Sequence, residues 1–429
     1  MNKYIFILIV LFSSVGQTLS NKDLDQLIEL YEGLHQEPEL SYQEFKTSKK
    51  LANILKELGF EVSTNFGGNG VVALLKNGKG KTVMIRADMD GLPIEEKTGV
   101  SYASKNLVTN LEGKIVPTMH ACGHDIHMTV LIGVAKELLM KKDSWRGNLL
   151  LVLQPAEEVS GGARNMIKEG LFEKFPRPSY NLALHVSADL EAGKVGYLSG
   201  YAMANVDAVD ITIFGLGGHG AYPHKTKDPI VLASQIINSL QSIVSREIAP
   251  IEPAVVTVGS IHGGSKHNII PNQVKLQLTL RSYTDEVRNK IIASIKRISI
   301  GMAQSYGLPK NLFPIVEVKD EYTPAVYNNP SLVDKLQKSF EKSIGSENVI
   351  RVQQVMGGED FGMYGRVEPI IPTALFWLGT VNKTNYKNAF INNYPLPSLH
   401  SDLFIPDSRP TIKTGIIVMH KAAIDLFNE

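Results

Sequence analysis

The sequence predicts an α/β protein in which helices flank a central sheet, with a smaller α+β domain inserted into it. Patterns typical of helices and of buried strands alternate along the first part of the chain, as in a sheet with helices on its faces. Around Gly196 to Tyr201 the pattern changes to strand, helix, strand, strand, helix, strand. Alternating α/β features resume after about Tyr322, which indicates that the middle set is an insertion.

The elements of the first part follow from apolar periodicity and from residues that end an element. Leu24, Leu27 and Ile28 recur at helical spacing, Gly59 ends a second helix, and Pro155 ends a strongly apolar strand. The expected helices are Asp23–Gln36, Thr47–Leu58 and His124–Met140. The expected strands are Val71–Leu75, Thr82–Ala87, Asn148–Leu153 and Ala183–Val186.

The inserted part begins with Val206–Phe214, whose residues alternate as in a half-buried strand. A helix, two strands and a longer helix are expected after it: Asp228–Ser245, Val255–Ile261, Val274–Ser282 and Asp285–Ser305.

Composition and the N-terminus limit the class of protein. Lys and Arg total 44 and Asp and Glu total 43, with no basic run that would suggest a nucleic-acid partner.

Lys3 precedes an apolar run from Tyr4 to Phe12, and small polar residues follow, so residues 1–20 are expected to be a signal peptide. The run is shorter than the roughly 20 apolar residues of a membrane span. We expect export to a periplasm or outside the cell, without stable membrane insertion after cleavage; the alternative is a tethering or buried N-terminal helix.

The densest chemical signal is the segment MHACGHDIH, Met119–His127. It places His120, Cys122, His124 and His127 at a loop-to-helix junction. Imidazole and thiolate are preferred ligands of zinc and similar metals, and a helix N-terminus favours the thiolate form of cysteine. The alternative is a histidine cluster of the core beside an inert cysteine. The motif would give the only cysteine of the chain a role.

A second motif, QPAEE, follows an apolar strand and ends in Glu157 and Glu158. Adjacent carboxylates face different directions, so one can bind a metal while the other accepts a proton from water. Such a pair by itself is usually a solvated turn, but here it is expected at the carboxyl end of a buried strand. His185 and His400 also lie at strand or loop ends, and a two-metal site needs about five or six protein ligands.

Further candidates lie in two other segments. In RADMDGLP, Asp88 and Asp90 could bind a metal or hold a ligand imidazole by its second nitrogen. In the insert, His219 lies on a glycine-rich turn and could stabilise an oxyanion. Asn268 and Arg281 could bind carbonyl and carboxylate groups of a substrate.

These motifs resemble, in order, those of the two-metal aminoacylase and carboxypeptidase superfamily. The match is closest to its amidohydrolase branch of hippurate hydrolases, N-acyl-amino-acid deacylases and auxin-conjugate hydrolases. The similar segments run from HQEPELSYQE through RADMDGLP, MHACGHDIH, QPAEE, GGHGAYPH, HNIIPN and GGEDFGMY to LHSDLF. The resemblance implies a catalytic domain, residues 21–200 and 322–429, with a dimerisation or lid domain inserted at residues 201–321.

The resemblance also implies roles for individual residues. It implies a general base at Glu157, with an aspartate at Asp90 that supports a ligand. His219 resembles the histidine that a dimer partner contributes to the oxyanion site, so a homodimer through the insert is expected. Asn268 and Arg281 are similar to substrate-contacting residues. The implied metal ligands are Cys122, His124, Glu158, His185 and His400.

The expected function is metal-dependent hydrolysis of the amide bond of a small N-acylated amino acid or peptide. Two divalent ions are implied; thiolate and imidazole favour zinc, and manganese, cobalt or nickel could also bind. One alternative is a dipeptidase or carboxypeptidase with the same ligands. A second, from another class, is a non-catalytic exported protein that binds a metal or ligand, which would need no base at Glu157.

Overall fold

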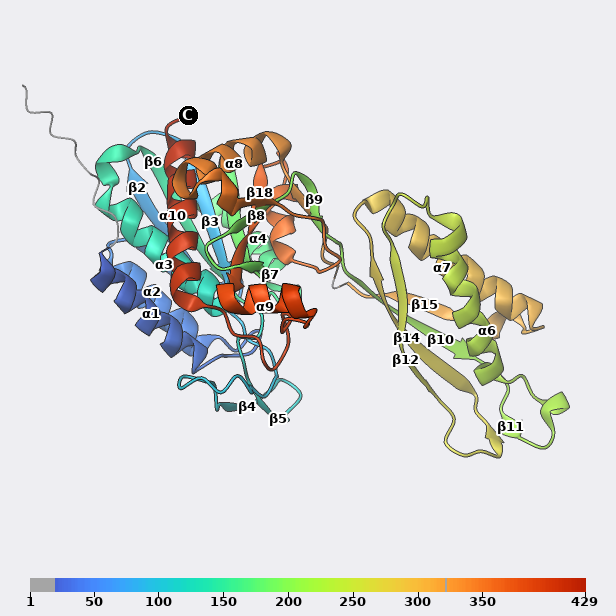
Figure 1. Ribbon diagram of the computed structural model, residues 1–429. Coiled ribbons are helices and arrows are strands. Elements are labelled where there is room, and N and C mark those ends of the chain that lie inside the picture. Colours follow the sequence, from blue (N-terminus) through green and yellow to red (C-terminus); the bar gives the residue numbers. More distant parts are fainter. Residues whose placement is uncertain (1–19, 321) are drawn as a thin grey trace, which may run out of the picture.

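A computed structural model describes residues 20–320 and 322–429 of the chain (Figure 1). The predicted signal peptide, residues 1–20, lies outside the described residues except for Ser20, so the peptide and the export it implies stay predictions. The Ser20 side chain caps the first helix, α1 (Asn21–His35). In the part that the structure describes, no helix is long and apolar enough to cross a membrane.

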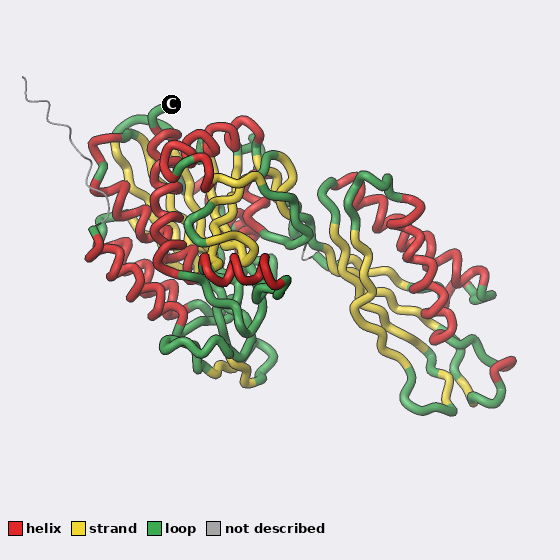
Figure 2. The backbone as a smooth tube through the Cα atoms, in the orientation of Figure 1, coloured by secondary structure: helices red, strands yellow, loops and turns green. Residues whose placement is uncertain are grey.

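The larger unit is built on an eight-stranded mixed sheet of order β1-β2-β6-β3-β7-β18-β8-β17 (Figures 1 and 2). The central strands β6, β3, β7 and β18 are parallel and almost continuously apolar, as expected for strands covered on both faces. The strands are β1 (Glu61–Phe66), β2 (Gly70–Asn77), β3 (Thr82–Asp88), β6 (Gly147–Gln154), β7 (Tyr180–Glu191), β8 (Val195–Tyr197), β17 (Val349–Arg351) and β18 (Thr373–Val381).

Side chains alternate between the two faces of this sheet and form two cores. In β3, for example, Val83 and Ile85 belong to the core on one face and Met84 to the core on the other. The first face is covered by α1, α2 (Phe45–Glu57), α3 (His124–Met140), α8 (Pro330–Ile344) and α10 (Ser408–Phe427). The second is covered by α4 (Gly162–Lys168), α5 (Leu171–Lys174) and the 3-10 turns of η6 (Asp360–Arg366).

The smaller unit has its own core and an antiparallel four-stranded sheet of order β12-β14-β10-β15 (Figure 1). Two helices cover one face of that sheet. Apart from a short two-stranded sheet, β11 (Gly218–His219) with β13 (Ile269–Ile270), the order of elements is the predicted one. The elements are β10 (Asp207–Phe214), α6 (Pro229–Ser242), β12 (Val255–Gly263), β14 (Gln273–Arg281), α7 (Asp285–Ser305) and β15 (Ile315–Val318).

The predicted fold class is therefore confirmed, with differences at element ends. The predicted strand Ala183–Val186 is longer, because β18 beside it continues to pair with β7 as far as Glu191. The helix predicted to reach Ser245 ends at Ser242 and continues as a π-helical turn. The remaining strands and α-helix are β4 (Leu107–Thr109), β5 (Ile115–Pro117), β9 (Gly200–Met203), β16 (Val326–Asn328) and α9 (Lys383–Asn392). The domain bounds at 201 and 321 stay predictions.

Candidate active site and metal centre

The candidate site lies at the carboxyl ends of the central parallel strands, where sites form in α/β sheets. Asp88, the last residue of β3, pairs with Gln154, the last residue of β6. The chain therefore presents Asp90 and Glu157 side by side just beyond the two strands. The N–H groups of Glu157 and Glu158 both donate to the Asp90 carboxylate, at 3.1 and 3.0 Å.

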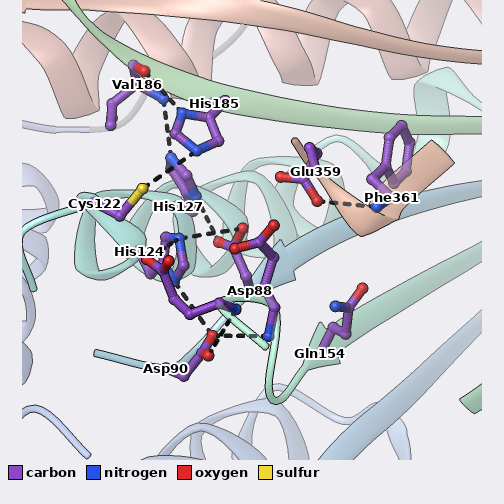
Figure 3. Close-up of polar contacts among 12 residues, drawn as sticks. Asp88, Asp90, Cys122, His124, His127, Gln154, His185, Val186, Glu359 and Phe361 are labelled. Carbon is purple, nitrogen blue, oxygen red and sulfur yellow. Dashed lines mark hydrogen bonds and ion pairs between the residues drawn. The ribbon is translucent and has the colours of Figure 1, made fainter. Parts of the chain in front are cut away.

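The MHACGHDIH segment reaches the same edge of the sheet from the start of α3. Gly123 has a positive φ of 74°, and a Cβ there would lie 2.6 Å from a methyl carbon of Val186 in β7. Only glycine fits both conditions, so the chain can approach β7 and place Cys122 and His124 on either side of the turn. Figure 3 shows Cys122 directed toward His185 of β7, and His124 in contact with Asp88 and Asp90.

The five predicted metal ligands come together in the fold. The ligand atoms of Cys122, His124 and His185 lie within 4.8 Å of one another, and so do those of Cys122, Glu158 and His400. The Cys122 sulfur is 3.6 Å from Nε2 of His185 and 3.3 Å from Nε2 of His400. Two such triads that share one sulfur would suit a pair of divalent ions, which these five residues would hold.

The polar atoms of this cluster are placed to bind metal ions rather than to form hydrogen bonds with one another. Nε2 of His124 and Oε1 of Glu158 are buried and make no hydrogen bond to any described residue. Their mutual separation is 3.9 Å. Nδ1 of His185 donates to the carbonyl oxygen of Val186, so Nε2 of the neutral ring carries no proton and has its lone pair beside the Cys122 sulfur. Buried polar atoms without partners are rare, and cations would satisfy these.

Negative charge also accumulates here. Burial, together with the Glu158 and Glu157 carboxylates, raises the pKa of the Cys122 thiol well above its ordinary value in the metal-free chain. Burial raises the pKa of Glu158 to about 7. Burial and the nearby Glu359 and Glu158 carboxylates raise the pKa of Glu157 well above its ordinary value. Bound cations would stabilise the ionised forms of these groups.

Two histidines of the motif, His127 and His120, are not part of the ligand cluster. His127 donates from Nδ1 to Asp88 at 2.5 Å and accepts the N–H of Val186 at Nε2, so both ring nitrogens are used. Figure 3 marks this His127–Asp88 contact with a dashed line. His120 is buried, and burial lowers its pKa to about 4, so it is a neutral histidine of the core.

Asp90 contacts both the ligand His124 and the backbone of the Glu157–Glu158 pair. One carboxylate oxygen lies 3.4 Å from Nδ1 of His124, while both oxygens accept the backbone N–H groups of the Glu157–Glu158 pair. Ala156, just before the pair, has a positive φ of 52°, and its N–H donates to the buried carboxylate of Glu44 at 2.8 Å. Glu44 and Asp90 together hold this strained turn. The predicted supporting role of Asp90 agrees with this geometry, whereas Glu44 was not singled out.

A buried network on the far side of Asp88 was also missed. Arg86 donates to Asp88 at 2.6 Å, to both oxygens of Glu359 at 3.2 and 2.9 Å, and to Asp360 at 3.0 Å. All four side chains are fully buried. Glu359 and Asp360 belong to the GGEDF motif, and their oxygens lie within 4.8 Å of a Glu157 oxygen. The signal that could have revealed this network is an arginine, Arg86, inside a strand predicted to be buried, since a buried arginine needs carboxylate partners.

We expect the substitution Arg86→Met to destabilise the fold by about 3–5 kcal/mol, because it leaves three buried carboxylates without their cation. Urea unfolding followed by circular dichroism would measure the change. Arg246→Met, at an exposed position, is the matched control. A loss below about 1 kcal/mol would show that the carboxylates do not depend on Arg86.

Two of the three candidates in the insert, His219 and Asn268, lie away from the metal ligands of their own chain. His219 and Asn268 are exposed neighbours at the β11–β13 sheet, where the Gly220 N–H donates to the Asn268 carbonyl. This sheet is at the end of the smaller unit remote from the large sheet (Figure 1). Arg281, at the end of β14, is instead half-buried and reaches the GGEDF segment: a Cβ on Gly358 would lie 3.2 Å from its guanidinium.

Two triads of metal ligands around one sulfur, with a buried carboxylate beside them, define a two-metal hydrolase. The chain belongs to the peptidase family M20/M25/M40, whose model matches residues 84–396. It is thus a metal-dependent amidohydrolase, and its resemblance to the two-metal superfamily is confirmed.

Individual relatives support this membership over most of the chain. It is 36% identical to thermostable carboxypeptidase 2 of Saccharolobus solfataricus, over 94% of this chain and 96% of that protein. It is 35% identical to the N-acetylcysteine deacetylase of Bacillus subtilis, over 83% of this chain and 88% of that protein. A solved Bacillus subtilis structure described as a dinuclear metal binding peptidase of the M20 family superimposes with a TM-score of 0.75 at 28% identity, covering 95% and 99%.

Proposed function

We propose that this enzyme hydrolyses the amide bond of small N-acyl amino acids and prefers apolar acyl groups. The observation that carries the proposal is a cavity of about 310 Å³ that opens beside the metal ligand Glu158. Its walls are mainly apolar, and two of the lining residues, Leu111 and Val159, have exposed fractions of 73% and 47%. Exposed apolar side chains beside a catalytic centre favour binding of an apolar group. Leu40, Leu92 and Pro93 also line the cavity.

Five residues of the chain would hold the metal ions, and Glu157 would transfer the proton. Cys122, His124, Glu158, His185 and His400 would hold two divalent ions, which lower the pKa of water and polarise a carbonyl when bound. As water attacks the scissile carbonyl carbon, the Glu157 carboxylate takes its proton and then passes it to the leaving nitrogen. Burial and neighbouring carboxylates raise the pKa of Glu157 in the metal-free chain, and bound cations would favour the ionised carboxylate that can take this proton.

A substrate panel on the metal-supplied enzyme tests the proposal, with amine release as the measurement. We expect N-acetyl-, N-hexanoyl- and N-benzoyl-L-alanine to be cleaved, with kcat/KM at least about 10-fold higher for hexanoyl than for acetyl. Leu111→Asn should reduce that ratio, whereas Leu107→Asn, on the same hairpin but outside the cavity, should not. Cleavage of Ala-Ala with no cleavage of any acylated alanine would contradict the proposal and favour a peptidase, as the carboxypeptidase relative suggests.

We also propose that a dimer partner supplies His219 to this site. Nδ1 of His219 accepts the N–H of Ala221, so the neutral ring carries its proton on Nε2 and can donate it to an oxyanion. The insert offers a surface for the partner: β12 pairs on one side only, with β14, among the described strands. Exposed apolar side chains lie on α6 and β12 nearby: Ile230, Val231 and Ile261.

Mixing two inactive variants tests this arrangement. We expect His219→Ala and Glu157→Gln each to be nearly inactive, while equal amounts refolded together recover about a quarter of wild-type activity. Half of the chains would pair as heterodimers, and each heterodimer would have one intact site. The mixture of Glu157→Gln with Glu158→Ala is the control and should recover nothing, since both residues serve one site. Absence of recovery in the first mixture, with dimers present, would place His219 outside catalysis.

A further inference from the structure

A second cavity, of about 470 Å³, lies among α1, α3, α8 and α10 on the helix-covered face of the large sheet. It adjoins the C-terminal end of α3, at Glu137 and Lys141, whereas the metal ligand His124 begins the same helix. The cavity is therefore separated from the active site by the length of α3, and the proposed hydrolysis makes no use of it.

The charged groups of this cavity are mostly cationic. Four lysines and one carboxylate line it. Lys141 is paired with that carboxylate, Glu137, at 3.3 Å, and Lys421 is paired with Asp425 on the next turn of α10. Lys342 of α8 and Lys413 of α10 have no acidic partner within 4.0 Å among the described residues. The cavity thus offers two ammonium groups to an anion.

The floor of the cavity is apolar and contains an imidazole. Leu24, Ile416 and Ile417 form the apolar walls. His420 also lines the cavity and is buried, and its Nε2 makes no hydrogen bond to any described residue. Burial and the neighbouring Lys141 and Lys421 charges lower the pKa of His420 to about 4, so the ring is neutral and its free Nε2 can hydrogen bond to a polar group of a ligand.

We propose that this cavity binds a monocarboxylate with an aliphatic chain. The carboxylate would lie between Lys342 and Lys413, and the chain would contact Leu24 and Ile416. A neutral apolar ligand would gain nothing from the two exposed ammonium groups, and a compact polyanion would leave the apolar walls in contact with water. An amphiphilic anion satisfies both surfaces.

Titration calorimetry with sodium octanoate on the metal-loaded enzyme tests the proposal. We expect saturable binding that weakens at least about 10-fold in the double variant Lys342→Glu, Lys413→Glu. Octanol, which lacks the charge, should bind at least about 10-fold more weakly than octanoate. The control is Lys338→Glu, one turn earlier on α8 and outside the cavity, which should bind octanoate like the wild type.

Hydrolysis by the double variant should remain at the wild-type rate, because the changed lysines lie at the opposite end of α3 from the metal ligands. Octanoate binding that is unchanged in the double variant would place the ligand elsewhere, for instance in the active site, and would overturn the proposal. Equal affinity for octanol, or no octanoate binding, would overturn it as well. None of these outcomes depends on which substrate the active site cleaves.

Discussion

The substitution Glu157→Gln is expected to lower kcat by roughly 100-fold or more while both metal ions stay bound. Glutamine keeps the size of the side chain but cannot take a proton from water. None of the five predicted ligand atoms is removed, and the N–H that donates to Asp90 remains. Steady-state kinetics on N-hexanoyl-L-alanine and elemental analysis of the purified variant would measure the two effects.

The neighbouring carboxylate provides the matched comparison. Glu158→Gln should lose metal as well as activity, because Glu158 belongs to a ligand triad and Glu157 does not belong to either triad around Cys122. Near-normal turnover by Glu157→Gln would remove Glu157 as the base. Loss of metal from Glu157→Gln would instead indicate that this side chain is a ligand.

Cys122→Ala is expected to abolish activity and to lower the metal content from two ions per chain to one or none. The sulfur is the atom common to both triads, so its removal affects both ions, whereas removal of His185 or His400 affects one triad. Elemental analysis and kinetics would be compared with His400→Ala. Two ions per chain retained by Cys122→Ala would refute a bridging role.

A restoring variant separates lost coordination from lost packing. Cys122→Asp returns an anionic donor at the same place and should retain more metal than Cys122→Ala, although both replace a buried side chain. Equal metal loss in the two variants, with both folded by circular dichroism, would mean that this position tolerates only sulfur or serves the fold alone.

Much of the site could be predicted from sequence because its chemistry is concentrated in short segments. Cys122 and His124 are two positions apart at a helix start, and Glu157 and Glu158 follow a buried strand directly, so local patterns indicated both their chemistry and their place at the sheet edge. His185 and His400 were predicted as ligands only through the family resemblance, since a single histidine in a strand or loop has no distinctive local signal.

Other features depended on contacts that no local pattern encodes. Arg86 contacts carboxylates more than 270 positions away, and Glu44 accepts a backbone N–H 112 positions away. His127 and His124 are chemically equal in the sequence, and only the pairing of His127 with Asp88 and Val186 shows that its nitrogens are already used. The positions of His219 and Asn268, remote from the ligands of their own chain, also required the fold.

The sequence by itself determined the fold class, the order of elements in the insert and the ligand motifs around Cys122, His124 and Glu158, because apolar periodicity and short ligand motifs are local properties. His185 and His400 were added by the family resemblance of the sequence. The tertiary structure decided which donors lie around the sulfur of Cys122 and which carboxylates contact Arg86. It also decided which cavities open, beside Glu158 and at the C-terminal end of α3. These are distances between segments far apart in the chain, and the packing of the two cores on the sheet sets them.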